Sequence, residues 1–121
     1  VLFRSRDSHR EFERAFARAG VPFYVYKGLG FFDADEVKDV MALVRCLAEP
    51  ASHLHAAAFL RSRFVRLSDR AVKHLAPRLA DALGAPAAPA ALDRLDAEDR
   101  GALTLARDAF ARWRRLADRQ A

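Results

Sequence analysis

Cysteine and histidine side chains, which could bind a metal ion or attack a substrate, are few in this 121-residue sequence: one cysteine, Cys46, and histidines at positions 9, 53, 55 and 74. His53 and His55 stand two residues apart, which on a helix turns their side chains in nearly opposite directions. No CxxC or HExxH spacing occurs, so the pattern does not support a metal site. Cys46 falls inside an apolar helical segment, which favours a structural thiol over a nucleophile.

Motifs for acyl or phosphate chemistry are also missing from the sequence. There is no GxSxG turn for a serine nucleophile and no GxxxxGK[ST] loop for nucleotide phosphates. Gly28-Leu29-Gly30 lacks the third glycine and the strand–turn–helix context of a dinucleotide site. We therefore expect neither ATP hydrolysis nor a bound cofactor from these residues alone.

Two short segments could instead bind an anion. Arg4-Ser5-Arg6 lies between a predicted strand and a predicted helix, where side chains and backbone N–H groups commonly face phosphate. Lys27-Gly28 combines a cation with a glycine, which lets another backbone approach closely. The alternative for Arg4-Ser5-Arg6 is an ordinary solvated loop, and the alternative for the segment at Lys27 is a plain hairpin-like turn; the residues alone leave both open.

The formal net charge is +5, and it is unevenly distributed. Residues 1–60 contain equal numbers of basic and acidic side chains, whereas residues 61–121 contain thirteen Lys and Arg against eight Asp and Glu. Eighteen of the basic residues are Arg, whose planar guanidinium suits phosphate. This pattern favours an anionic partner such as nucleic acid, although a general preference for Arg would produce the same composition.

The first thirty residues are predicted to form a strand, a helix and a second strand. Val1-Leu2-Phe3 is a short apolar run, and Ser8 with Glu11 forms a capping box that starts a helix. Gly20 is expected to end that helix from the position after its C-cap. Phe23-Tyr24-Val25-Tyr26 has the aromatic and β-branched composition of a strand. This order is a βαβ unit.

A longer helix is expected between Asp33 and Pro50, with Asp33 and Glu36 as its N-terminal signature. Its apolar residues cover nearly the whole circumference and leave one polar strip of Lys38, Arg45 and Glu49. A helix of this kind is buried on several sides. Residues 1–32 are too few to cover it, so we expect it to lie inside something larger.

The rest of the chain is predicted to be helical. Helices are expected over about 52–61, from Ser68 to a break at Pro77 and on to Gly84, and from about Glu98 to Arg119, with a loop at 85–89. No uninterrupted apolar run exceeds five residues, which is too short for a membrane span. The predicted fold class is α/β grading to mostly α.

Four segments of the first half follow one another in a recognisable order: Val-Leu-Phe-Arg-Ser-Arg at 1–6, Ala-Gly-Val-Pro-Phe-Tyr-Val-Tyr at 19–26, Lys-Gly-Leu-Gly-Phe-Phe-Asp at 27–33 and Glu-Val-Lys-Asp at 36–39. Together they resemble the UvrD/Rep/PcrA-like superfamily 1 DNA helicases, including helicase–nuclease relatives of the AddA and RecB type. The similarity extends from residue 1 to about residue 70, and its most specific part is 27–39.

This resemblance implies a partial RecA-like βαβ unit, with residues 1–61 in a second RecA-like motor domain and residues 62–121 beginning a helical accessory domain. It implies a fragment of an ATP-dependent 3′–5′ DNA helicase of repair or recombination, inactive alone, whose parent protein binds ATP and Mg²⁺ elsewhere. The expected partners are single-stranded DNA, bound without sequence preference, and the remaining helicase domains. The expected location is the cytoplasm, without membrane contact.

The resemblance also implies six DNA-contacting residues: Arg4, Ser5, Arg6, Lys27, Gly28 and Lys38. Two of them depart from the family pattern, which usually has Asn at the position of Arg6 and Gly at that of Lys27. The duplex-contacting GIG turn of the accessory domain reads Arg66-Leu67-Ser68 here, so duplex binding is not carried over to it. The residues from Arg61 to Asp69 look more like the helicase–nuclease branch.

A second class of function follows from the last predicted helix. Its apolar stripe passes through Phe110 and Trp113 and could dock on a partner protein, which would make the chain a small helical interaction module. An independent small enzyme is a third class, and no residue pattern supports it.

Overall fold

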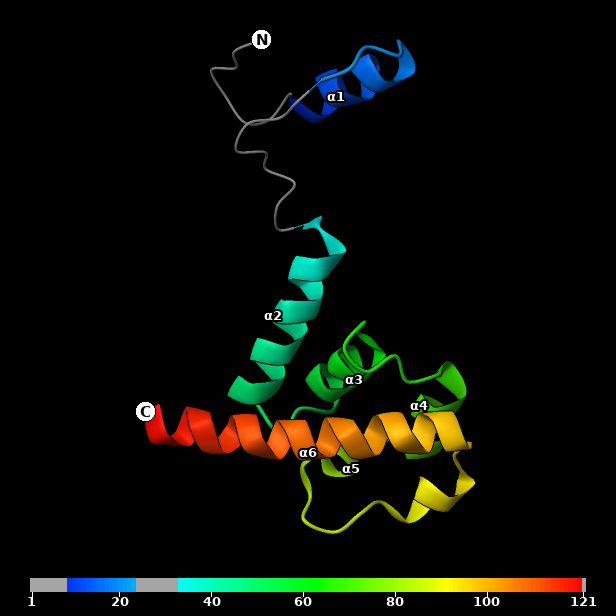
Figure 1. Ribbon diagram of the computed structural model, residues 1–121, viewed down its shortest axis with the longest axis vertical. Coiled ribbons are helices and arrows are strands. Elements are labelled where there is room, and N and C mark those ends of the chain that lie inside the picture. Colours follow the sequence, from blue (N-terminus) through cyan, green and yellow to red (C-terminus); the bar gives the residue numbers. More distant parts are fainter. Residues whose placement is uncertain (1–8, 24–32, 121) are drawn as a thin grey trace. The chain divides into compact units, whose positions relative to one another are not determined.

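The computed structural model describes residues 9–23 and 33–120, and every regular element in them is a helix (Figure 1). The chain forms two compact units, residues 1–34 and residues 35–121. The predicted strands at 1–3 and 23–26 lie outside the described residues, apart from Phe23, which is not in a strand. The described part of the chain is mostly helical, and the βαβ unit stays a prediction.

The first unit contains α1 (His9–Arg18), which ends as its sequence predicts. Gly20 has a φ of 66°, the left-handed conformation in which glycine avoids the steric cost of a Cβ atom. Its N–H donates to the carbonyl of Ala17 at 3.2 Å, and the N–H of Val21 donates to the carbonyl of Phe16 at 3.0 Å. These two bonds form a Schellman motif, which confirms that Gly20 ends the helix.

Asp33, predicted as the N-terminal signature of the next helix, has a different partner in the structure. Its carboxylate pairs with the guanidinium of Arg10 within the first unit. The helix begins two residues later, at Asp35.

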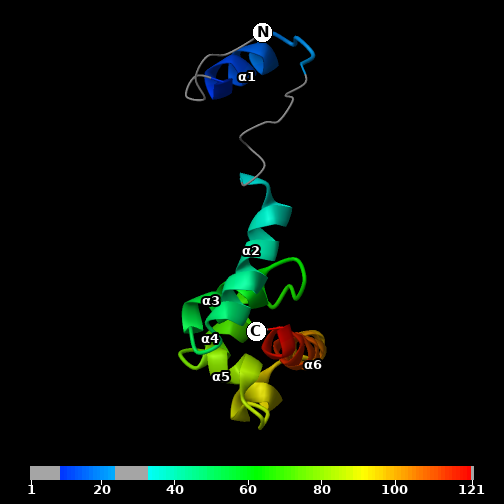
Figure 2. The ribbon, with the colours of Figure 1, turned by 90° about the vertical axis from the view of Figure 1, so that its left-hand side faces the viewer.

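The second unit contains five α-helices and one short 3₁₀ helix: α2 (Asp35–Ala48), α3 (His53–Arg61), α4 (Asp69–Leu75), α5 (Leu79–Gly84), η2 (Ala90–Arg94) and α6 (Ala97–Gln120). The predicted helices are confirmed to within about two residues at their ends, and the break at Pro77 separates α4 from α5. The 3₁₀ helix was not predicted. Figure 2 looks along α6 and shows the other helices of this unit on one side of it.

The core of the second unit lies between α3, α5 and α6. Phe59 of α3 and Phe110 of α6 are each 1% exposed, and their ring centroids lie 6.4 Å apart. Trp113 adds an edge-on contact to Phe59, with the two centroids at 6.3 Å. Leu103 of α6 is fully buried beside them, and α5 packs against α3 and α6. This aromatic contact joins segments that are 51 residues apart in the sequence.

Serine side chains cap two helices of this unit, and the cap at Ser68 was predicted. Ser52 accepts a hydrogen bond from the N–H of His55 at 3.2 Å, and Ser68 accepts one from the N–H of Ala71 at 3.1 Å. Ser68 is itself fixed by the buried carboxylate of Asp99 in α6, which accepts from its N–H at 2.9 Å and from its hydroxyl at 2.5 Å. The first turns of α4 and α6 are thereby linked.

The helix predicted to be apolar around its circumference is only partly covered by the described residues. In α2, Cys46 is the one buried side chain, whereas Val40, Met41 and Val44 are 48%, 38% and 50% exposed. Leu43 and Leu47 pack against the core. The second unit therefore covers one face of α2 and leaves the apolar side chains beside that face exposed.

The apolar stripe of α6 does not form a free docking surface at Phe110. That side chain is buried in the core of the second unit, and Trp113 packs on Phe59. The interpretation that α6 docks on a partner through Phe110 is therefore wrong, because the chain itself covers the residue. Leu105 and Leu116 of the same helix are exposed.

Candidate nucleic-acid interface

Most residues predicted to touch DNA lie outside the described part of the chain. Arg4, Ser5, Arg6, Lys27 and Gly28 all belong to that group. Lys38 is described: it lies on α2, is exposed, and has no hydrogen bond or ion pair with another described residue. Its ammonium group is therefore available to an anion.

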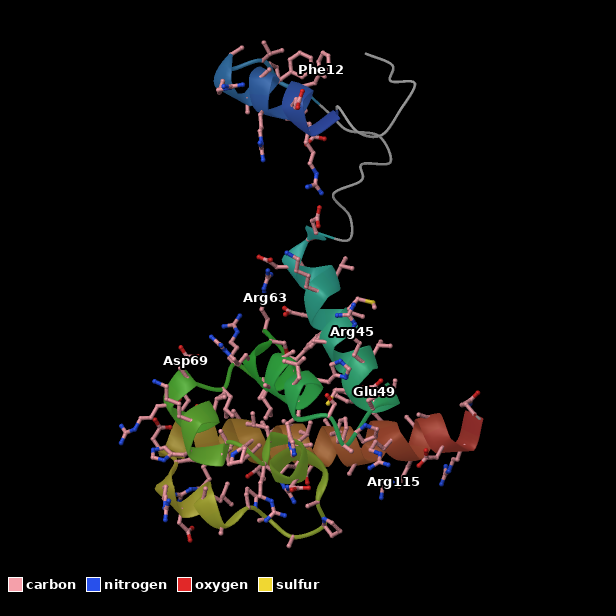
Figure 3. The ribbon with its side chains drawn as sticks, turned by 180° about the vertical axis from the view of Figure 1, so that it is seen from behind. Phe12, Arg45, Glu49, Arg63, Asp69 and Arg115 are labelled. Carbon is pink, nitrogen blue, oxygen red and sulfur yellow. The ribbon has the colours of Figure 1, made fainter. Side chains whose placement is uncertain are left out.

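The acidic residues around Lys38 are paired with Arg63. The guanidinium of Arg63 lies 3.0 Å from Glu36, 3.1 Å from Asp35 and 3.5 Å from Asp39. Figure 3 shows Arg63 beside the N-terminal half of α2. Sequence patterns do not point to Arg63, because residues 24 to 28 positions apart give no local signal of contact.

This cluster changes the ionisation of its members. The pKa of Glu36 lies below its usual value, first because of a hydrogen bond to its own backbone and then because of the Arg63 guanidinium. The hydrogen bond to Glu36 in turn raises the pKa of Arg63. Glu36 and Asp39 belong to the Glu-Val-Lys-Asp segment, so its two acids attach α2 to the loop after α3, while Lys38 between them stays free.

Other cations of the second unit serve the fold. Arg61 pairs with Asp69 at 2.8 Å, and Arg78 pairs with Asp81 at 2.9 Å. Arg107 donates to the backbone carbonyls of residues 82, 85 and 87, the last two at 2.7 and 3.1 Å. These arginines account for part of the positive charge that the sequence places after residue 60.

A groove of about 440 Å³ lies between α6 and the end of α5. Its lining includes Arg107, Arg114 and Arg115, the acids Asp108 and Asp118, and the segment 83–86. Figure 3 shows Arg115 on the C-terminal half of α6. The charge distribution of the sequence indicated a basic second half but did not locate this groove, which forms only when α5 packs on α6.

Within the described part of the chain, the remaining candidates for reactive side chains are histidines and Cys46. No cluster of three potential metal ligands exists among residues 9–23 and 33–120. His53 accepts a hydrogen bond at Nδ1 from the N–H of Ala80 at 3.1 Å. Nδ1 of His55 lies 3.4 Å from a carboxylate oxygen of Glu49, without hydrogen-bond alignment. Cys46 is fully buried, and this burial raises the pKa of its thiol to about 11, which favours a structural thiol.

None of the described helices combines the length and the apolar character that a membrane-spanning helix needs.

Comparison with known proteins shows the class to which this helical chain belongs. The UvrD-like helicase C-terminal domain matches residues 1–85, and the chain therefore belongs to this family. The match includes the predicted DNA-contacting segments, α1 to α5 and the Arg63 cluster. No solved structure matches the chain significantly.

Three relatives illustrate the similarity. The chain is 31% identical to ATP-dependent DNA helicase UvrD1 of Mycobacterium tuberculosis over 71 residues, which are 59% of this chain and 9% of that protein. It is 35% identical to DNA helicase II of Escherichia coli over 48 residues, 40% of this chain and 7% of that protein. It is 29% identical to an ATP-dependent helicase/nuclease subunit of Lysinibacillus sphaericus, over 98% of this chain and 10% of that protein. The chain thus spans a tenth or less of each relative.

Proposed function

We propose that this chain is part of an ATP-dependent 3′–5′ DNA helicase that unwinds DNA in repair or recombination. The observation that carries the proposal is the match of residues 1–85 to the UvrD-like helicase C-terminal domain, together with relatives that are named as DNA helicases. The chain contains no Walker-type phosphate loop, so ATP and Mg²⁺ bind elsewhere in the complete protein. The role of this chain is then to contact DNA, in the cytoplasm.

Within that protein, residues 1–61 form part of the second RecA-like motor domain with its βαβ unit, and residues 62–121 begin the accessory domain. The two portions are not independent in space, since α2 and α3 pack with the later helices in one unit. Accessory-domain movement would therefore be transmitted to α2 through the shared core.

The DNA-contacting residues are Arg4, Ser5, Arg6, Lys27, Gly28 and Lys38, which hold the phosphates of a single strand without reading its sequence. Support comes from the exposed ammonium of Lys38, whose acidic neighbours are engaged by Arg63. A lysine between free carboxylates would be a poorer phosphate contact, because the carboxylates would repel the same phosphate.

The extent of similarity favours the helicase–nuclease branch. The alignment with the helicase/nuclease relative covers 98% of the chain, whereas the alignment with UvrD1 covers 59%.

The exposed apolar face of α2 supports the proposal that this chain is one part of a larger protein. Val40, Met41 and Val44 form a continuous exposed stripe at helical spacing. Contiguous exposed apolar surface commonly marks an interface. We assign this face to contact with the remaining helicase domains, which suits a chain that spans a tenth of its relatives.

The test replaces both arginines of the first segment, Arg4→Ala with Arg6→Ala, in the complete protein. Two lost phosphate contacts are expected to lower the affinity for a single-stranded oligonucleotide about tenfold and to reduce the salt slope by about two. Arg14→Ala with Arg18→Ala on α1 is the charge-matched control and should have little effect. Unchanged affinity and unwinding in the first variant would show that the assignment of Arg4 and Arg6 is wrong.

A further inference from the structure

We propose that the groove between α6 and the end of α5 binds single-stranded DNA, with Arg114 and Arg115 as its phosphate contacts. This inference rests on the proposed function, because it adds a second DNA-contacting surface to the same chain. It assigns a role to the basic second half of the sequence, which the residues predicted to bind DNA leave unexplained.

The first argument is the difference between cations that the fold uses and cations that it leaves free. Arg61, Arg78 and Arg107 are engaged by carboxylates or carbonyls. Four arginines of α6, at positions 112, 114, 115 and 119, have no hydrogen bond or ion pair with another residue of the described part. A free guanidinium gains a charge-assisted bond to phosphate without losing an internal one.

The second argument is that the groove is formed before any ligand binds. Arg107 fixes the segment after α5, which forms one wall of the groove. Its guanidinium donates hydrogen bonds to the carbonyls of Ala82, Ala85 and Ala87. Two of these bonds satisfy carbonyl groups at the C-terminal end of α5 that the helix leaves without partners, and the bond to Ala87 holds the loop that follows. A wall held in this way loses little conformational freedom on binding, which favours affinity.

The charges around the groove limit where a phosphate can lie. Arg107, Arg114 and Arg115 attract it, whereas Asp108 and Asp118 repel it. Because Asp108 and Asp118 lie on either side of the two free arginines in the sequence of α6, a phosphate is favoured only near Arg114 and Arg115. The site therefore takes a short stretch of backbone.

The size of the groove selects a single strand over a duplex. Its volume of about 440 Å³ lies in the range of small-ligand sites, about 300–1,000 Å³. A flexible strand can place a nucleotide in such a space, whereas a duplex, with a major groove alone about 12 Å wide, can touch only the rim. Pro86 and Ala111 in the lining offer apolar contact to a sugar or a base that a duplex keeps stacked.

The experiment measures binding of the complete protein to a single-stranded oligonucleotide and to a blunt hairpin duplex, by fluorescence anisotropy at several salt concentrations. The variant is Arg114→Gln with Arg115→Gln, and the charge-matched control is Arg70→Gln with Lys73→Gln, two exposed residues of α4. We expect the groove variant to bind the single strand about tenfold more weakly, with a salt slope reduced by about two. The control should bind like the unaltered protein.

A second variant tests the groove without removing a cation. Ala111→Glu adds a carboxylate to the lining and should weaken single-strand binding about as much as the double substitution. Circular dichroism of each variant verifies that the helices are retained.

The outcomes separate this inference from the proposed function. If the Arg4 and Arg6 variant loses affinity and the groove variant does not, the groove inference alone is overturned. If the α4 control loses as much as the groove variant, net charge explains the effect and the inference is also overturned. A loss confined to the duplex would overturn the choice of a single strand. An unaltered protein that binds neither probe would overturn the proposed function itself.

Discussion

Two helices of the second unit differ in how far the chain covers their apolar side chains, and the more apolar helix, α2, is the less covered. The side chains of α6 that enter the core include Leu103, which is fully buried, and Phe110, which is 1% exposed. In α2, Cys46 is the one buried side chain, and Val40 and Val44 remain about half exposed. The difference shows that an apolar helix is covered only where the chain supplies a facing surface, as α3 and α5 do for α6.

The comparison also shows that different interactions stabilise the positions of the two helices. The middle of α6 is held by burial of large side chains, whereas the N-terminal half of α2 is held by ion pairs to Arg63 at the surface. Burial of an aromatic side chain contributes several kcal/mol, while an exposed ion pair contributes much less. Each element should therefore respond differently to substitution and to pH.

The largest expected effect is the loss of the aromatic contact in the core. Phe110→Ala should lower the free energy of unfolding by about 3–5 kcal/mol, because it removes a buried ring and leaves a cavity beside Phe59. Urea denaturation followed by the fluorescence of Trp113, the single tryptophan, measures this unit directly. Phe64→Ala is the matched control, since its ring is 54% exposed and should cost far less. Equal losses would contradict the assigned core.

The second effect concerns Cys46, which joins α2 to that core. The thiol is fully buried, and its pKa is raised to about 11 from 9.0. At pH 8 the thiolate fraction is then about a hundredfold lower than for an unperturbed cysteine, and alkylation should be slowed at least that much. Urea should restore the rate of an accessible thiol. Fast alkylation of the folded chain would show that α2 separates from the core.

The same shift gives a sign for the dependence on pH. The pKa of Cys46 in the folded chain lies above that in the unfolded chain, so its full contribution to stability is present below about pH 9. That contribution is lost as the pH rises from about 9 to about 11. Cys46→Ala should remove this part of the alkaline loss.

The third effect tests the link between α4 and α6. Asp99→Ala leaves the N–H and hydroxyl of Ser68 without their acceptor, at a site where the carboxylate is 5% exposed. Loss of such a buried acceptor should cost about 1–3 kcal/mol in the same denaturation experiment. Asp93→Ala, an exposed carboxylate in η2, is the control and should change stability by less than about 0.5 kcal/mol.

Whether a feature of the fold or of the candidate site could be predicted from the sequence depends on how far apart in the sequence the interacting residues lie. Helix ends governed by adjacent residues were predictable: Gly20 ends α1, and Ser68 caps α4. Contacts between residues far apart in the sequence could not be predicted. They include the ion pairs of Arg63 with α2, the hydrogen bonds of Ser68 to Asp99, and the groove between α5 and α6. The sequence pattern through Phe110 indicated an apolar face of α6. Only the packed structure shows that other helices of the same chain cover Phe110.

The fourth effect is small in this chain and larger in the complete protein. Val44→Gln places a polar group on the open face of α2 and should change the stability of the chain by less than about 0.5 kcal/mol. If the remaining helicase domains cover this face, the same substitution should lower the melting temperature of the complete protein by at least about 2 °C. Arg45→Gln, on the polar strip of α2, is the control. Equal behaviour of the two variants in the complete protein would contradict an interface there.

The smallest effect concerns the ion pairs that hold the N-terminal half of α2. The pKa of Glu36 is lowered in the folded chain, so its contribution is present above its unfolded value of about 4.5 and is lost as the pH falls through the folded value. Arg63→Gln should therefore shift the urea midpoint slightly at pH 7 and hardly at all at pH 3. Arg66→Gln, an exposed neighbour that pairs with none of these acids, serves as the control. A shift of the same size at both pH values would mean that Arg63 acts through packing of its aliphatic stem, and α2 would then be held by burial in the way that α6 is.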